Sequence, residues 1–210
     1  MREPATSRAH GFVAFEAVRI FLAGATGVIG VRLVPLLVRA GHTVAGMTRS
    51  PDKVAALVEG GAKPVVCDVF DAAQLTDAVA SFAPEAVIHQ VTDLPDLRRD
   101  LGDKAADNDR MRTEGTRNLV AAAQAGHAER FVAQSIAWRP AGRGHLVDAH
   151  ERQVLDIGGV VARYGQLYGP GTYYERELPS HPRIHVDAAA RSTPPLLDAP
   201  SGIVTIADPE

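Results

Sequence analysis

Hydrophobic and polar positions fall into alternating blocks along this chain. Short, uninterrupted apolar runs, which are typical of buried parallel strands, recur between segments whose apolar residues follow a helical spacing. The runs that predict strands are residues 18–23, 43–47, 64–69, 86–90, 130–134, 158–163 and 201–207, and the segments that predict helices are 31–40, 51–59, 71–82, 109–125 and 149–157. Strands that alternate with helices are joined by right-handed crossovers, so the pattern predicts a doubly wound α/β domain with a parallel sheet.

A glycine-rich turn joins the first predicted strand to the first predicted helix. The sequence Gly24-Ala25-Thr26-Gly27-Val28-Ile29-Gly30 follows the apolar run without a gap. In such a turn the first glycine allows a tight bend, the second lets phosphate oxygens approach the backbone, and the third lets helix and strand pack closely. The free N–H groups of the helix start then face the anion. The motif therefore predicts a pyrophosphate site; a purely structural turn is the alternative.

Composition and charge limit the classes of partner that the chain is expected to bind. The chain is 46% hydrophobic and 22% charged, as in a folded domain, and its net charge of −3 provides no basic field for nucleic acid. Cys67 is the single cysteine, so no internal disulfide forms and a reducing, cytoplasmic location is expected, with the thiol buried and inert. No apolar run approaches the roughly 20 residues that span a bilayer, so we expect no membrane association.

The end of the second predicted strand bears on the choice of cofactor. In dinucleotide-binding folds this position meets the adenosine ribose, and an acidic residue there binds the 2′-hydroxyl of NAD. Here the sequence is Thr48-Arg49-Ser50. An arginine pairs with the 2′-phosphate of NADP and a serine donates a further hydrogen bond, so NADP is favoured over NAD. The alternative is a solvated arginine in an exposed loop.

Several further segments carry a family resemblance. With the glycine turn, they resemble in order the NAD-dependent epimerase/dehydratase branch of the short-chain dehydrogenase/reductase superfamily, in its extended and atypical forms. The segments are Cys67–Val69, Val87–Gln90, Glu114–Val120, Phe131–Ser135, Val161–Gly171 and His185–Asp187. The resemblance implies an NAD(P)-binding Rossmann domain over residues 17–177, preceded by a flexible extension (1–16) and followed by a short remnant of the substrate lobe (178–210).

The resemblance also implies roles for individual residues. Asp68 and Val69 would flank the adenine, Gln90 would border the ribose and nicotinamide, and Ser135 would hydrogen-bond the reacting oxygen of the substrate. The expected cofactor site thus comprises Gly24, Thr26, Gly27, Val28, Ile29, Gly30, Arg49, Ser50, Asp68, Val69 and Gln90, with Ser135 as the catalytic residue and no metal.

The family's proton donor is missing from the sequence. Members normally carry a tyrosine followed four residues later by a lysine, which lowers the pKa of the phenol. No lysine follows Lys104, and the corresponding positions hold about Arg143 and Val147. His145 or His150 could substitute, although an exposed loop histidine is the simpler interpretation. Acidic residues at 93–109 are interspersed with arginines and indicate a solvated surface rather than a metal site.

Three functions remain open on the sequence alone. The first is an oxidoreductase or epimerase-like enzyme that acts by hydride transfer on a small carbonyl, hydroxyl or sugar-type substrate. The second is a non-catalytic NADP(H) sensor, and the third is a shortened, inactive paralogue. The resemblance leaves homodimer formation open. The sequence identifies neither the substrate nor the direction of the reaction.

Overall fold

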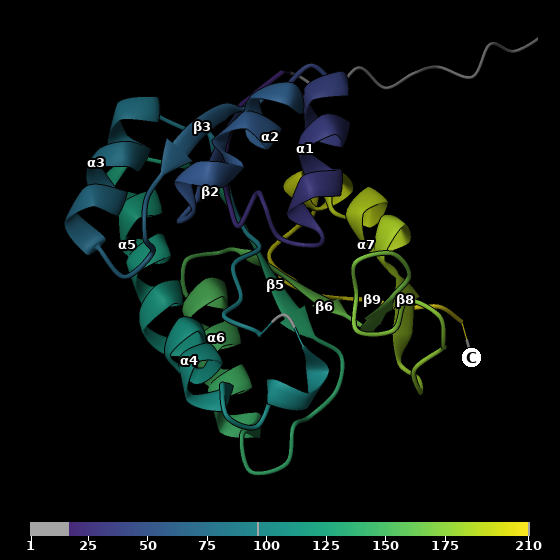
Figure 1. Cartoon of the computed structure of the whole chain (residues 1–210). Helices are drawn as coiled ribbons and strands as arrows, with labels where there is room; N and C mark the ends of the chain where they lie inside the picture. The colour runs from purple at the N-terminus through teal and green to yellow at the C-terminus, as the bar shows by residue number, and fades with distance from the viewer. Residues whose placement is uncertain (1–16, 96, 210) are drawn as a thin grey trace, which may run out of the picture.

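A parallel sheet forms the centre of the computed structural model, which describes residues 17–95 and 97–209 (Figure 1). The predicted N-terminal extension, residues 1–16, lies outside the described residues. The sheet order is β3-β2-β1-β4-β5-β6-β9, with every neighbouring pair parallel. Its strands are β1 (Arg19–Ala23), β2 (Thr43–Thr48), β3 (Lys63–Val66), β4 (Ala86–His89), β5 (Arg130–Ile136), β6 (Val160–Tyr164) and β9 (Gly202–Ile206). This topology confirms the predicted doubly wound α/β fold.

Helices cover both faces of the sheet. They are α1 (Gly30–Arg39), α2 (Val54–Glu59), α3 (Ala72–Phe82), α4 (Ala105–Arg110), α5 (Thr116–Ala125), α6 (Gly144–Leu155) and α7 (Val186–Ser192). Shorter helical turns are the 3₁₀ segments η1 (Pro51–Lys53), η2 (Arg98–Asp100) and η4 (Pro194–Asp198), and the π-helical turn η3 (Met111–Gly115). A separate two-stranded parallel sheet pairs β7 (Gln166–Tyr168) with β8 (Arg183–His185).

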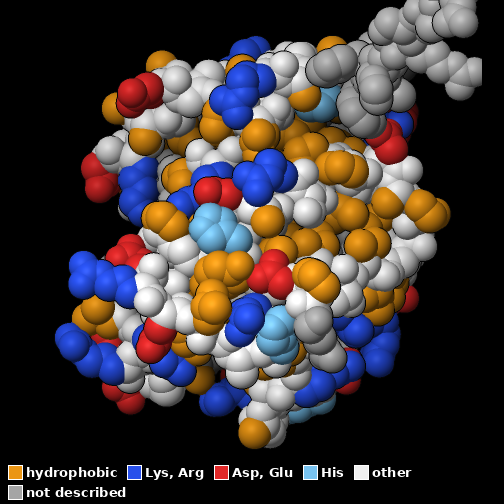
Figure 2. Space-filling view, turned by 90° about the vertical axis from the view of Figure 1, so that its right-hand side faces the viewer, with side chains coloured by type: hydrophobic (Ala, Val, Ile, Leu, Met, Phe, Trp, Pro, Cys, Tyr) orange, Lys and Arg blue, Asp and Glu red, His pale blue; other side chains and the backbone are white. Residues whose placement is uncertain are grey.

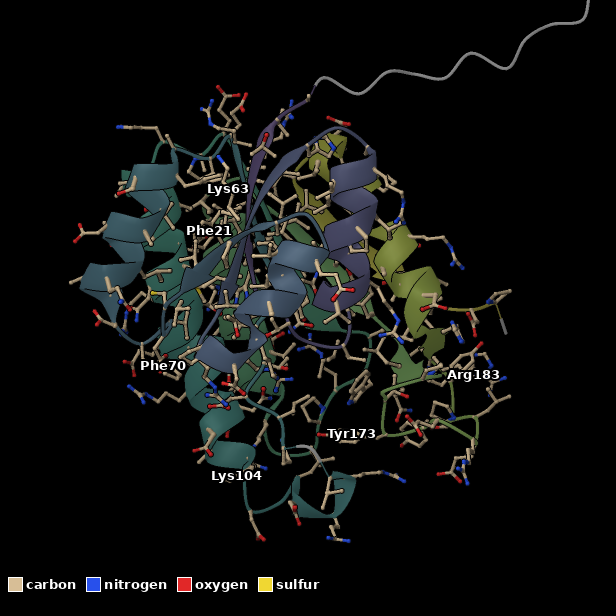
Figure 3. All side chains as sticks on the ribbon, turned by 45° about the horizontal axis from the view of Figure 1, so that its top comes forward. Phe21, Lys63, Phe70, Lys104, Tyr173 and Arg183 are labelled. Carbon is tan, nitrogen blue, oxygen red and sulfur yellow. The ribbon has the colours of Figure 1, made fainter. Side chains whose placement is uncertain are left out.

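Side chains of β1 alternate between two hydrophobic layers. Ile20 and Leu22 are buried with residues of α1, α2 and α7 on one face. Phe21 is buried on the opposite face with residues of α3, α5 and α6, and Figure 3 shows it in the interior of the molecule. Because a parallel sheet is covered on both faces, its central strands read as continuous apolar runs, which is why they could be predicted.

Some helix boundaries differ from the sequence prediction. Helix α6 begins at Gly144, five residues before the predicted start at 149. The helix predicted over 109–125 begins at Ala105 and is interrupted by the π-helical turn η3 before α5. Strand β3 ends at Val66 rather than 69. Hydrophobic periodicity detects the buried face of a helix and therefore misses polar first turns.

The C-terminal segment contains elements that the sequence analysis missed. Helix α7 contacts α1, and Val186, Ala189 and Ala190 belong to the same buried cluster as the apolar face of α1. Strand β9, in contrast, matches the strand predicted over 201–207, and it extends the main sheet beside β6. Figure 2 shows hydrophobic side chains gathered on this side of the molecule. Within the described ranges, no helix is long and apolar enough to cross a membrane.

The close approach of α1 to the end of β1 gives a stability prediction. A Cβ atom on Gly30 would lie 2.2 Å from the carbonyl oxygen of Gly24, which is backbone and cannot rotate away. We expect Gly30→Ala to lower the free energy of unfolding by about 1–3 kcal/mol or more, as overpacking does. Denaturant unfolding measures this, with Gly102→Ala as the control because nothing lies within 4 Å of a Cβ there. A Gly30→Ala protein as stable as the control would contradict the packing argument.

Candidate functional site

A cleft of about 920 Å³ opens at the carboxyl ends of the parallel strands. The strand order reverses between β1 and β4, and ligands of open α/β sheets bind at such a switch point. Eleven of the predicted site residues line this cleft: Gly24, Thr26, Gly27, Val28, Ile29, Arg49, Ser50, Asp68, Val69, Gln90 and Ser135. Gly30 is buried beneath the turn instead. Residues far apart in the sequence are thus gathered around a single cavity.

The glycines of the turn differ in what surrounds them. Gly24 has a positive φ of 82°, and a Cβ there would lie 2.6 Å from backbone atoms of Gln90. These contacts hold the end of β1 against the end of β4. Gly27 is exposed, and a Cβ there would meet only the carbonyl oxygen of Gly24, at 3.3 Å. The space in front of Gly27 therefore belongs to the cleft.

The start of α1 has the properties of an anion site. No side chain caps the helix, and its first turn contains no acidic residue. The positive end of the helix dipole is therefore not offset by an acidic or capping side chain, although the N–H groups of Val31, Arg32 and Leu33 already donate to backbone carbonyl oxygens within the turn. An uncapped helix start, preceded by a glycine with open space before it, fits the pyrophosphate of a dinucleotide.

The side of the cleft that was predicted to meet the adenosine is built on β2 and β3. The hydroxyls of Thr26 and Thr48 lie 3.0 Å apart, and the Arg49 guanidinium donates to Asp93 at 2.9 Å. The carbonyl oxygen of Val69 accepts a hydrogen bond from Asn118 of α5 at 3.0 Å, which fixes the loop after β3. This loop begins at Cys67, whose pKa is raised to about 11 by burial and nearby carboxylates, so the thiol stays protonated and unreactive at neutral pH.

Ser135 belongs to a buried ionic network. Its hydroxyl donates to Glu151 of α6 at 2.6 Å, and the same carboxylate accepts two hydrogen bonds from Arg163 of β6. Burial would raise the pKa of Glu151, but the hydrogen bonds from Arg163 and Ser135 outweigh it and hold this pKa below its usual value. Glu151 is therefore ionised at neutral pH. Because the Ser135 hydroxyl donates its proton to Glu151, only the lone pairs of its oxygen are left to contact another group.

A chain of hydrogen bonds connects two buried histidines that line the cleft. Thr116 lies between them, 3.2 Å from His89 Nε2 and 2.8 Å from His150 Nδ1. The other nitrogen of His150 donates to the carbonyl oxygen of Gln134 at 2.8 Å. Burial lowers the pKa of both histidines, so both are neutral near pH 7. His150 is consequently a positioned, neutral group with both ring nitrogens occupied, whereas His145 is exposed on the surface.

Gln90 carries an unpaired polar atom at the cleft. Its amide nitrogen lies 3.4 Å from the hydroxyl of Tyr164, which in turn lies 2.6 Å from Thr193. Its Oε1 is buried and has no hydrogen-bond partner within the described part of the chain. Burial raises the pKa of Tyr164, so this phenol differs from the low-pKa tyrosine of the resembling family. The orphaned amide oxygen is a further sign that a polar ligand completes the site.

The positions expected for the missing tyrosine and lysine are occupied differently. Arg143 precedes α6 and donates to Asp109 at 2.8 Å, while Val147 is fully buried on α6. Neither residue lines the cleft. The described residues also include no group of three or more His, Cys, Asp or Glu side chains that could hold a metal ion.

Arg32 links the start of α1 to the C-terminal segment, and the sequence analysis missed it. Its guanidinium donates to the carbonyl oxygens of Val28 and Pro170, at 2.8 and 2.7 Å, and to Asp187 of α7 at 2.6 Å. This arginine stands one helical turn after Val28, and that spacing was the only sequence signal available. The phosphate-side turn, the Gly169–Gly171 loop and α7 are held together at this point.

Comparisons with known proteins agree with this geometry. A family model described as NAD(P)H-binding matches residues 24–148. A Streptomyces protein named 3-diazoavenalumate denitrifying reductase is 40% identical over 184 residues, and the match covers 76% of this chain. The same match covers 59% of the relative, so this chain spans less than two thirds of that protein's length.

Solved structures show the same fold at lower identity. WbmG from Bordetella bronchiseptica in complex with NAD has a TM-score of 0.72 at 20% identity, covering 91% of this chain and 73% of its own. The UDP-glucose 4-epimerase of Thermus thermophilus in complex with NAD has a TM-score of 0.73 at 19% identity, covering 91% and 78%. The family model matches more than half of the chain, and the cleft carries the glycine turn that such a family requires. The chain therefore belongs to the NAD(P)H-binding family and has the Rossmann fold of the NAD-dependent epimerases.

Proposed function

We propose that this protein is an NAD(P)H-dependent reductase of a small organic molecule. The observation that carries the proposal is the convergence of the glycine turn, the loop after β3, Gln90 and Ser135 on one continuous cleft. When bound, the cofactor supplies a hydride from its nicotinamide ring. The protein's own part is to hold the dinucleotide, exclude water and orient the acceptor. Its location would be the reducing, cytoplasmic compartment that a single buried cysteine suits.

In this proposal each side of the cleft has a separate task. The uncapped start of α1 holds the pyrophosphate, and the loop at Asp68 and Val69 borders the adenine. Gln90 borders the nicotinamide ribose with its unpaired amide oxygen. Ser135, oriented by Glu151, contacts the reacting group of the substrate. Residues 178–210 belong to the substrate side of the protein.

The hydrogen-bonding state of Ser135 favours one class of hydride acceptor. Reduction of a carbonyl creates a negative oxygen that needs a proton donor, and this cleft lacks the tyrosine–lysine pair. An acceptor that already carries positive charge is neutralised by hydride and needs no such donor. We therefore infer that electron-poor, cationic acceptors suit this site better than ketones or sugars. The Streptomyces relative is named for a diazo substrate, so diazo compounds are the first to assay.

The cofactor choice that we propose is NADP(H) over NAD(H). Arg49 and Ser50 line the cleft after β2, and Lys53 adds a second cation on the same wall. Asp93 pairs with Arg49 across an exposed contact in the absence of ligand. A 2′-phosphate would compete with Asp93 for the guanidinium, and its greater charge favours the phosphate.

Gly27→Val tests the phosphate turn. A valine side chain there would project into the cleft without meeting the protein interior, so the fold should survive while the pyrophosphate is displaced. We expect NADPH binding to weaken by about a hundredfold or more, because the phosphate would lose several hydrogen bonds from the backbone. Titration calorimetry and thermal unfolding measure the two effects. Unchanged affinity in a folded variant would exclude this turn as the phosphate site.

Arg49→Ala tests the cofactor preference. Loss of a charge-assisted contact should weaken NADPH binding by roughly ten- to a hundredfold and leave NADH binding nearly unchanged. The exposed Arg39 at the end of α1 is away from the cleft, and Arg39→Ala is the matched control. Equal losses for both cofactors would show that Arg49 does not read the 2′-phosphate.

Ser135→Ala tests the proposed reductase activity. The assay follows NADPH oxidation with an aryl diazonium salt, a ketone and a UDP-sugar, because these acceptors differ in their need for a proton donor. We expect turnover with the diazonium, lowered at least about tenfold in Ser135→Ala because the lone pairs of the Ser135 oxygen would no longer face the positive charge of the acceptor. Tight NADPH binding without turnover of any acceptor would indicate the non-catalytic sensor instead. Turnover that is insensitive to Ser135→Ala would exclude its proposed role.

A further inference from the structure

Arg112 lines the same cleft as Ser135. The proposed mode of cofactor binding assigns no contact to it. Arg112 belongs to the π-helical turn η3, and π-helical turns are frequent at functional sites. The pKa of Arg112 is lowered, and the largest cause is burial. The attraction of Asp109 and Glu151 for the guanidinium raises this pKa by less than burial lowers it. Arg112 is therefore a partly buried cation whose loss of hydration is not fully repaid by the protein.

The carboxylates near Arg112 are already engaged by other arginines. Asp109 accepts from Arg143 at 2.8 Å, and Glu151 is held by Arg163 and Ser135. No hydrogen bond or ion pair of the Arg112 guanidinium to any described residue accompanies these contacts. Its donors are thus available to a ligand in the cleft that Ser135 also lines.

Asn108 supplies a second free donor on the same wall. It is 9% exposed, lines the cleft and precedes Arg112 by four residues, so the two side chains lie on successive turns of one helical face. Its side-chain amide makes no hydrogen bond within the described ranges. A guanidinium fork and an amide that project from successive turns are well suited to the two oxygens of a carboxylate.

The surroundings of this pair are apolar. Leu101, Ile136 and Trp138 line the same cleft, and 38% of the Trp138 surface remains exposed. Tyr173, which is labelled in Figure 3, also lines the cleft, and its hydroxyl donates to the carbonyl oxygen of Pro95. An aromatic ring with a flat apolar face packs favourably against an indole in such a setting.

We propose that Arg112 and Asn108 form a carboxylate subsite, and that the substrate is a small aromatic acid whose ring contacts Trp138. The inference rests on the proposed reductase function for its biological meaning, because the subsite lies beside Ser135 and would place the ring at the reacting centre. Binding of the acid itself does not require turnover and can be measured separately. Arg112 and Asn108 would then set the specificity for acids over neutral analogues.

Binding of benzoate and benzamide tests the subsite. Trp138 is the single tryptophan of the chain, so its fluorescence reports directly on this wall. We expect benzoate to bind about ten- to a hundredfold more tightly than the neutral benzamide, both with and without NADPH. Arg112→Gln should remove this difference, while Arg112→Lys should restore part of it. Arg110→Gln is the matched control, because Arg110 pairs with Glu114 and does not line the cleft.

Each outcome of this experiment decides one question. Equal binding of benzoate and benzamide, or discrimination that survives Arg112→Gln, overturns the subsite. An equal loss of NADPH and benzoate affinity in Arg112→Gln, in a protein of unchanged thermal stability, overturns it in favour of a cofactor contact. If benzoate is discriminated through Arg112 but NADPH does not bind, the subsite stands and the reductase proposal fails.

Discussion

The steric contact between Gly24 and Gly30 is the constraint on which the rest of the site depends. With no Cβ on either residue, β1 can turn against the backbone of Gln90 while α1 starts directly above the turn. That geometry places the start of α1 beside the sheet's carboxyl edge, where Gln90 after β4 and Ser135 of β5 line the same cleft. A side chain at Gly30 would push α1 away from the turn, and a side chain at Gly24 would push the turn away from the backbone of Gln90.

The reactive side is organised around an ionised carboxylate instead of a tuned phenol. Glu151 is held by Arg163 and fixes the rotamer of Ser135, while neutral His150 supports the backbone of β5 through Gln134. These contacts give rigidity but no proton donor of suitable pKa near the substrate. These residues can therefore position a bound molecule and stabilise charge. In the proposed reductase, the cofactor and the acceptor would supply the reacting groups themselves.

Much of the fold could be predicted because it is encoded locally. Buried strands are short apolar runs, and the phosphate turn is contiguous in sequence from Gly24 to Gly30. Helix α7 could not be predicted, since its short alanine-rich sequence becomes helical through packing against α1. The lack of an ion-pair partner for Arg112 among the residues that the structure describes could not be predicted either. It depends on the folded structure, in which Asp109 pairs with Arg143 and Glu151 pairs with Arg163.

The Arg32 contacts have a thermodynamic consequence. The Arg32 guanidinium donates hydrogen bonds to the turn at Val28, to the loop at Pro170 and to the carboxylate of Asp187. The glycine-rich turn, the Gly169–Gly171 loop and α7 are therefore held together by one side chain. A ligand that stiffens the phosphate turn also favours the docked arrangement of α7 and the Gly169–Gly171 loop, and by reciprocity a ligand held by that loop favours the turn. In the proposed reductase, the affinities for cofactor and substrate would therefore be coupled through Arg32 by the same factor in both directions.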